Sequence, residues 1–225
     1  RTVGESFAPK NNQKNILGDI ELNTVTENGK RCYVTPAGDK YPSVTTVLSE
    51  YKKDGIKQWR KRVGEKEANK ISTQASRRGT KVHKLCEDYL DNEENLFEGY
   101  TPDNVVMFKS IQEILNEIEI VYGQERTLFS NHLRTAGRVD CVGKFRGKNH
   151  IIDFKTSNKP KKWEGIDNYF MQGSAYSVMW EEMTGIPIPN IAIIIAVADD
   201  EPQVFLEKRD NWIEKFIEVR NNYDK

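Results

Sequence analysis

The chain has 225 residues, with 34 basic and 34 acidic side chains and no net charge. This length is enough to bury the core of one large domain. The longest apolar run, residues 191–198, is far shorter than the ~18 residues of a membrane helix. Three scattered cysteines, Cys32, Cys86 and Cys141, form no C-x-x-C pair. This argues against a disulfide framework, a zinc knuckle or a four-cysteine cluster, and it indicates a reducing compartment.

The first half of the chain is predicted to be mostly helical. Residues 1–30 are polar and predict an irregular arm or a weak hairpin, and residues 31–35 predict a short strand. Ser43 is a predicted helix N-cap, because apolar residues follow it at helical spacing as far as Tyr51. Further helices are predicted over residues 56–71 and 76–90, and another begins near Thr101-Pro102, where proline is tolerated.

The second half alternates between strands and helices. Strands are predicted over residues 118–129, 135–145, 148–156, 190–198 and 203–207, and helices over residues 166–184 and 210–222. This order predicts an α/β (α+β) fold with a mixed β-sheet core flanked by helices. We therefore divide the chain into an N-terminal arm with short strands (1–40), a helical cap (41–118) and a core (119–225) that is compact with the cap.

Charge is distributed unevenly along the helical cap. Residues 52–84 hold twelve basic and three acidic side chains, whereas residues 85–119 hold ten acidic side chains and one lysine. The basic stretch fits a polyanionic partner. Alternatively, the two stretches are solvated helical faces that attract each other.

A predicted hairpin places two carboxylates side by side. If Arg146-Gly147 forms a two-residue turn, the numbers of paired residues add up to 293, and Asp140 lies opposite Asp153. Because side chains alternate between the faces of a strand, Arg138 and Lys155 share the face of these aspartates. The other predicted face is apolar and carries Val139, Cys141, Ile152 and Phe154.

Carboxylates in directly opposite positions repel each other unless a cation lies between them. A divalent metal provides that charge, because hard Mg²⁺ or Mn²⁺ takes carboxylate oxygens. The alternative is a surface patch in which Arg138 and Lys155 neutralise Asp140 and Asp153. A metal held by both aspartates would activate water and bind a phosphate oxygen, and Lys155 would stabilise developing negative charge. The pattern therefore fits hydrolysis of a phosphate ester.

Four short motifs follow one another along the chain. They are G-x-x-x-H at 79–83, G-x-x-D at 137–140, D-x-K at 153–155 and Q-x-x-x-Y at 172–176. A D-x-K alone is common by chance, but this order and spacing resemble the PD-(D/E)xK nuclease superfamily, and more narrowly its RecB-like branch. Within that branch the chain is most similar to the mitochondrial genome maintenance exonucleases and related phage exonucleases. The likeness covers roughly residues 41–224, including Pro42 to Thr45 and Asp167-Asn168.

The resemblance implies a restriction-endonuclease-like fold with Mg²⁺ or Mn²⁺ as cofactor. The metal ligands that it implies are His83, Asp140, Asp153, the main-chain carbonyl of Phe154 and, as an additional acid on the preceding strand, Glu125. The catalytic residues that it implies are Asp140, Asp153, Lys155, Gln172 and Tyr176.

Each of these assignments has a structural alternative. A lone histidine on a helix, such as His83, is more often structural, and Gln172 and Tyr176 are one turn apart, as in ordinary helix packing. Glu87, one turn after His83, is either solvated surface or a partner of the site.

The basic cap is the predicted path of DNA. Tyr51 and Trp59 are candidates for base stacking, although Trp59 fits core packing equally well. Phosphate contacts are predicted for Arg60, Arg77, Arg78, Lys81, Lys159, Lys161 and Lys162. No base-reading motif is visible, so we expect little sequence specificity.

Two features depart from the family pattern. Three dispersed cysteines exclude the iron–sulfur version of the RecB-like fold, and Val139 replaces the usual proline before the first catalytic aspartate. The chain also lacks a G-x-x-x-x-G-K-[S/T] motif, so a helicase motor would be a separate chain.

The sequence thus predicts a metal-dependent deoxyribonuclease, an exonuclease that prefers single-stranded DNA ends. The alternatives are a structure-specific or non-specific endonuclease and a non-catalytic DNA-binding recombination partner. Asp140, Asp153 and Lys155 are all present, which counts against the latter. A small phosphate ester as substrate would leave the basic cap unexplained.

The expected context is DNA recombination or repair, with a separate helicase or a single-strand annealing or binding protein as partner and no membrane. The expected location is intracellular: the cytoplasm of a phage-infected host, or the mitochondrion if a targeting segment has been removed. The first residue is Arg1, so the sequence leaves open whether a targeting segment precedes it.

Overall fold

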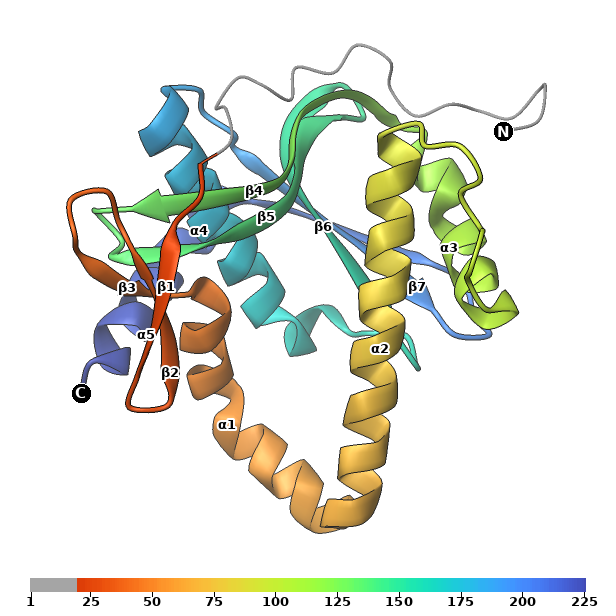
Figure 1. The fold of residues 1–225 in the computed structure, drawn as a ribbon, viewed down its shortest axis with the longest axis horizontal. Coiled ribbons are helices and arrows are strands. Elements are labelled where there is room, and N and C mark those ends of the chain that lie inside the picture. Colours follow the sequence, from red (N-terminus) through yellow and green to blue (C-terminus); the bar gives the residue numbers. More distant parts are fainter. Residues whose placement is uncertain (1–19) are drawn as a thin grey trace.

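The computed structural model describes residues 20–225 and has a mixed α/β architecture (Figure 1). A five-stranded sheet has the order β4-β5-β6-β7-β8, and a separate three-stranded sheet has the order β1-β2-β3. The strands are β1 (Asn23–Glu27), β2 (Lys30–Val34), β3 (Lys40–Pro42), β4 (Ile118–Ser130), β5 (Thr135–Phe145), β6 (Lys148–Ser157), β7 (Asn190–Val197) and β8 (Gln203–Lys208). The helices are α1 (Val44–Val63), α2 (Glu65–Leu90), α3 (Pro102–Leu115), α4 (Asp167–Thr184) and α5 (Ile213–Tyr223). The predicted mixed sheet flanked by helices is confirmed.

The five-stranded sheet combines antiparallel and parallel pairing. Strands β4, β5 and β6 are antiparallel neighbours, β7 lies parallel to β6, and β8 returns antiparallel to β7. The parallel step needs a crossover, which α4 provides. The β5–β6 ladder runs from Phe145↔Lys148 to Cys141↔Ile152, which confirms the predicted register. Arg146 and Gly147 both have positive φ, 50° and 79°, as a type I′ turn requires.

Helices cover both faces of this sheet. On one face an apolar cluster joins the sheet to α4, α5 and the start of α1, with Phe170 and Trp180 fully buried. On the other face a second cluster joins it to α2 and α3, with Tyr89 and Phe108 fully buried. The side chains of Ile191–Val197 in β7 alternate between the two clusters. A strand buried on both faces reads as a continuous apolar run, which is the pattern that the sequence shows here.

One part of the predicted alternation is wrong. Val139 packs in the cluster on the α4 face, whereas Cys141 packs in the opposite cluster with Ile152 and Phe154. The β5–β6 ladder ends at Cys141. On the other side of β5, Glu125 has a left-handed φ of 50° between the pairs that β4 makes with Cys141 and Val139. Regular alternation is therefore not maintained past Asp140.

Helices α1 and α2 form a V whose tip lies at Gly64 (Figure 1). The sequence predicted three helices before residue 91, with breaks near residues 52–55 and 72–75; the structure corrects this to two helices with one break. Gly64 has φ +88° and ψ 145°, a conformation that glycine adopts without steric cost. The residues around Gly55 and Gln74 are mostly exposed and remain helical.

The remaining predicted boundaries agree closely with the structure. Ser43 caps α1, since its hydroxyl accepts a hydrogen bond from the Thr46 amide at 3.0 Å. Helix α5 begins at Ile213, three residues later than predicted, after a short 3₁₀ turn at Arg209–Asn211. The part of the predicted N-terminal arm before residue 20 lies outside the described residues. Within residues 20–225, no helix combines the length and apolarity that crossing a membrane requires.

Candidate active site

The four motifs come together where β5 and β6 separate. His83 comes from α2, Asp140 from β5, Asp153 and Lys155 from β6, and the Gln172–Tyr176 motif from α4. Asp140 and Asp153 lie one residue beyond the last β5–β6 pair. Because the strands no longer bond to each other there, side chains from the helices on both faces of the sheet can approach the same point.

Three candidate metal ligands form a tight group. One ligand atom each from His83, Glu125 and Asp140 lies within 4.8 Å of the other two. His83 Nε2 contacts Glu125 Oε1 and lies 3.5 Å from Asp140 Oδ1. Glu125 holds its left-handed backbone conformation, which is uncommon for a residue other than glycine. Arg138 Nε lies 2.8 Å from the other oxygen, Oε2. The strained strand thus turns the predicted additional acid toward His83.

The charges in this group are dominated by acids. Burial and then the neighbouring Asp153 carboxylate raise the pKa of Asp140 well above its ordinary value. Burial alone would lower the pKa of His83, but Glu125 and Asp140 outweigh it and raise the pKa to about 9. The cluster therefore attracts positive charge. Carboxylate oxygens and an imidazole nitrogen are donors that Mn²⁺ accepts, and Mg²⁺ favours the carboxylates.

Asp153 and Lys155 form a neighbouring pair. Lys155 Nζ lies 2.9 Å from Asp153 Oδ2 and donates a hydrogen bond to Gln172 Oε1 at 3.1 Å. Gln172 Nε2 in turn donates to the Tyr176 hydroxyl at 3.4 Å. The ammonium also lies 4.8 Å from the centre of the Tyr169 ring. The D-x-K and Q-x-x-x-Y motifs are thus one connected network.

Of the two motif glycines beside this network, one is needed for the close approach of the elements. A Cβ atom on Gly137 would lie 2.8 Å from Tyr176 Cε1 and 3.0 Å from its hydroxyl, so the tyrosine ring rests directly on the backbone of β5. On α2, a Cβ atom on Gly79 would lie 3.5 Å from Thr156 Oγ1, which is ordinary contact. Gly137 is therefore required by the fit of Tyr176, while Gly79 lies against β6 without crowding.

The other residues considered near the metal have different surroundings. The Phe154 amide donates a hydrogen bond to Asp140 Oδ2 at 3.0 Å, so Phe154 orients that carboxylate; metal binding by its carbonyl stays a prediction. Asp153 is not in the group of three and faces Lys155. Glu87 lies 3.5 Å from Lys84 Nζ and is likewise outside the group.

The predicted DNA-binding residues lie on three segments. Tyr51, Trp59 and Arg60 lie on α1, Arg77, Arg78 and Lys81 on α2, and Lys159, Lys161 and Lys162 on the loop after β6. Arg60 bonds Glu65 and Asn69 across the Gly64 bend, and Arg78 bonds Asn158. Arg77, Lys81 and the three loop lysines are exposed, and Trp59 is half-buried.

Sequence reasoning missed two members of this site. It considered Arg138 only as a neutraliser of the aspartates, whereas its guanidinium holds Glu125. It gave no role to Tyr169, whose ring covers Lys155. The spacing of Tyr169, Gln172 and Tyr176 at i, i+3 and i+7 was the available signal for the latter.

Comparison with known proteins agrees with the motifs. The chain is 34% identical over 128 residues to mitochondrial genome maintenance exonuclease 1 of Mus musculus, and 30% identical over 131 residues to that of Homo sapiens. Each match covers 53% of this chain and 38% of the relative. A presumed exonuclease from Eubacterium rectale, known from a crystal structure, is 18% identical, with a TM-score of 0.44 over 67% of this chain and 65% of that chain. No protein-family model matches the chain.

The chain spans about two fifths of the length of the curated relatives named above, since the matches cover 38% of them. The resemblance predicted from the four motifs is nevertheless confirmed at the level of the matched region. Over this region, the chain is similar to mitochondrial genome maintenance exonuclease 1, as the four motifs predicted.

Proposed function

We propose that this chain is a Mg²⁺- or Mn²⁺-dependent deoxyribonuclease, an exonuclease that acts on single-stranded DNA ends. The observation that carries the proposal is the position of the His83–Glu125–Asp140 group beside the Asp153–Lys155 pair. A cluster of acids next to a half-buried lysine is suited to binding a cation and a phosphate together. The names of the matched relatives support the same activity.

His83, Glu125 and Asp140 are the proposed metal ligands, with Asp153 and the Phe154 carbonyl completing the site. The donor set fits the cation, because one imidazole nitrogen and two carboxylate oxygens lie within 4.8 Å of one another. A bound divalent cation would supply the charge that binds phosphate oxygens and that makes a water molecule more acidic.

Lys155 is the proposed stabiliser of the phosphate. Its ammonium is held by Asp153 and by Gln172, and its position is fixed further by the Tyr169 ring. A preorganised cation of this kind stabilises negative charge that grows on a phosphate oxygen without reorganising during the reaction. Gln172 and Tyr176 orient Lys155 from α4, and Phe154 orients Asp140 through its amide.

The V of α1 and α2 is the proposed guide for the DNA strand. Its limbs carry exposed basic residues, and the lysines that follow β6 lie on the loop after Asp153 and Lys155. Phosphate contacts by these side chains would be independent of base sequence. A single strand fits such a guide better than a duplex, because its bases are free to stack on Tyr51 and Trp59.

We propose DNA recombination or repair as the setting, with a helicase or a single-strand annealing or binding protein as a separate partner. The name of the matched relatives makes the mitochondrion the first location to test, ahead of the cytoplasm of a phage-infected host.

The test is degradation of end-labelled linear and closed circular single-stranded DNA with Mg²⁺, Mn²⁺ or EDTA. We expect linear DNA alone to be degraded, with either metal and not with EDTA. Asp153→Ala and Lys155→Ala should abolish this, whereas Lys208→Ala, an exposed lysine on β8, should not. Cleavage of circles would instead establish an endonuclease. Salt-sensitive binding without cleavage would establish a DNA-binding protein and overturn the proposal.

A further inference from the structure

Asp167, the first residue of α4, joins three helices outside the catalytic group. Its carboxylate accepts hydrogen bonds from the Tyr51 hydroxyl at 2.7 Å and the Lys52 ammonium at 2.5 Å, both on α1. It also accepts one from the Lys215 ammonium on α5 at 3.1 Å. The Asp167 side chain is only 13% exposed, whereas those of its partners Lys52 and Lys215 are 33% and 44% exposed, so these charge-assisted bonds lie at the edge of the packed region.

The α1 limb has little else to hold it. Within α1, the only buried residues are Val44, Val47 and Leu48, all in its first two turns. Within α2, Ala68 is buried and the next buried residue is Val82. The limbs of the V are therefore anchored at their ends, and the bonds to Asp167 lie just beyond the last buried contact of α1.

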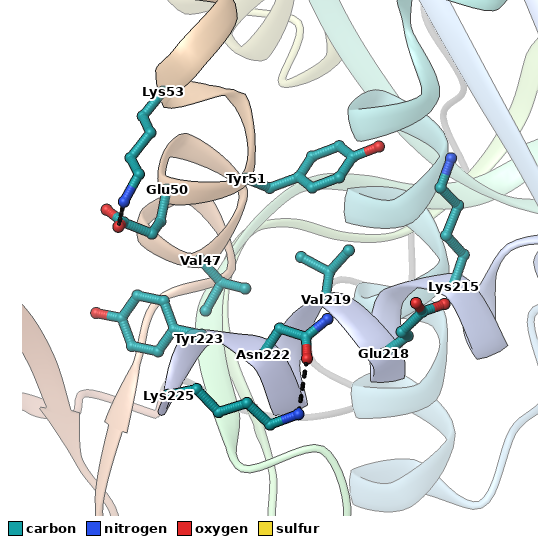
Figure 2. Close-up of a pocket in the computed structure, with 10 residues that line it drawn as sticks. All are labelled: Val47, Glu50, Tyr51, Lys53, Lys215, Glu218, Val219, Asn222, Tyr223 and Lys225. Atoms are coloured by element: carbon teal, nitrogen blue, oxygen red, sulfur yellow. Dashed lines mark hydrogen bonds and ion pairs between the residues drawn. The ribbon is translucent and has the colours of Figure 1, made fainter.

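The packing beside these bonds is open. A groove of about 530 Å³ separates α1 from α5 and is lined by Val47 and Tyr51 on one side and by Lys215, Val219 and Tyr223 on the other. Figure 2 shows Tyr51 reaching from α1, and Lys215 from α5, toward the same side of this groove. Apolar packing does not close this region, and the polar contacts at Asp167 are those that tie α1 to α4 and α5 here.

The same helix that begins with Asp167 carries part of the proposed site. Tyr169 follows two residues later and covers Lys155, and Gln172 accepts the lysine hydrogen bond. We propose that Asp167 is a positioning residue that fixes the α1 limb of the DNA guide to the catalytic helix α4. This inference rests on the proposed function, because it assigns the limb a role in placing the DNA strand over Lys155.

Electrostatics and positioning predict opposite results at this residue. Replacing Asp167 by asparagine removes a negative charge and frees Lys52 and Lys215 for phosphate contacts. If charge alone mattered, DNA would bind more tightly. If Asp167 positions α1, the limb is looser in the variant. DNA then binds more weakly, because ordering the limb on binding costs conformational entropy.

The experiment compares the full chain with its Asp167→Asn and Lys215→Met variants. Asp103→Asn is the matched control, an exposed aspartate in the first turn of α3. Hydrogen exchange is measured on the free, metal-free proteins. Affinity for single-stranded DNA is measured in EDTA by fluorescence anisotropy, and Mn²⁺ affinity is measured by electron paramagnetic resonance.

For Asp167→Asn we expect about tenfold faster exchange over residues 49–63 and about tenfold weaker DNA binding, the effect of losing one charge-assisted hydrogen bond. Exchange over residues 82–90 and Mn²⁺ affinity should not change. Lys215→Met should also speed exchange over residues 49–63 and weaken DNA binding, but by less. Asp103→Asn should leave both the exchange and the DNA affinity unchanged. Equal or tighter DNA binding by Asp167→Asn, or unchanged exchange in the limb, would overturn the inference. The exchange result does not depend on cleavage. An inactive wild-type chain with this exchange pattern would therefore refute the proposed function, but the attachment of α1 to α4 through Asp167 would still hold.

Discussion

The proposed catalytic cluster and the V of α1 and α2 are built in different ways. In the cluster, Asp153 and Tyr176 are almost fully buried, and the carboxylates, lysine, amide and phenol each contact a defined neighbour. In the V, residues 49–81 bury Ala68 alone, and Gly64 and the bonds to Asp167 set the direction of the limbs. The proposed active site is thus held by contacts from several elements, whereas the proposed DNA guide is held at a few points.

Mutations in the two regions should affect different properties. Changes in the cluster should abolish chemistry and leave DNA binding largely intact, because the cluster contributes few of the phosphate contacts. Changes in the V should weaken DNA binding and leave metal binding intact, because no proposed metal ligand lies between residues 49 and 81.

The largest expected effect is at Asp153 and Lys155. Asp153→Asn and Lys155→Met should each lower the single-turnover rate of DNA cleavage by about a thousandfold or more, the scale found when a preorganised charge is removed from an active site. DNA affinity in EDTA should change by less than about threefold. Quench-flow cleavage and anisotropy measure the two quantities. Retention of a near-normal rate by either variant would contradict the assigned roles.

The second test uses the contact between Gly137 and Tyr176. Gly137→Ala places a methyl group 2.8 Å from Tyr176 Cε1, so the tyrosine must shift away from β5. We expect a loss of about 1–3 kcal/mol in the free energy of unfolding and roughly ten- to hundredfold slower cleavage as the Gln172–Lys155 bond is disturbed. Urea unfolding and single-turnover kinetics check both.

Gly165→Ala is the matched control for this change. A Cβ atom there has no neighbour within 4 Å, and the residue lies in the 3₁₀ turn before α4. Its free energy of unfolding should stay within about 0.5 kcal/mol of the wild-type value, and its cleavage rate should stay within about twofold. Equal losses in both glycine variants would show that the effect comes from the backbone and not from Tyr176.

Sequence reasoning predicted the core of the molecule well because local rules apply there. Alternation and turn chemistry gave the register that pairs Cys141 with Ile152, and thereby the closeness of Asp140 to Asp153. The run of branched residues from Ile191 predicted a buried strand. The failure at Val139 arose where the ladder ends, since strand alternation holds only as long as neighbours keep the strand regular.

The V could not be predicted in the same way. A solvated helix has no apolar stripe to mark its length, so the two predicted breaks were placed at polar residues and the true break at Gly64 was not recognised. The partners of Asp167 lie 115 and 116 residues earlier in the chain and 48 residues later, a separation over which spacing rules carry no information. Glu125 was predicted from the resemblance, but its left-handed backbone and its bond to Arg138 required coordinates.

The third test acts on the tip of the V. Gly64 occupies a region of backbone space that other residues rarely adopt, so Gly64→Ala should cost about 1–3 kcal/mol of unfolding free energy or force the two helices to change direction. In either case DNA affinity should fall while Mn²⁺ affinity stays unchanged. Gly55→Ala is the opposite control, because Gly55 is helical with open space around it and alanine should add about 0.5–1 kcal/mol of stability. Tighter DNA binding by Gly64→Ala would contradict the role of the bend.

The smallest expected effect is the pH dependence of the stability that the hydrogen bonds to Asp167 provide. Burial alone would raise the pKa of Asp167, but hydrogen bonds from Lys52, Tyr51 and Lys215 outweigh it and lower the pKa from 3.8 to about 2. Because the folded state binds its proton less readily than the unfolded state, the stabilisation is complete above about pH 5 and is lost as the pH falls toward 2. After allowance for solvent screening, we expect Asp167→Asn to cost about 1–2 kcal/mol at pH 6 and roughly half of that at pH 3. Urea unfolding of both proteins at the two pH values measures the difference, and Asp103→Asn should show little cost at either. A cost that grows as the pH falls would mean that the ion pairs at Asp167 do not stabilise the fold, and the α1 limb would then need another anchor.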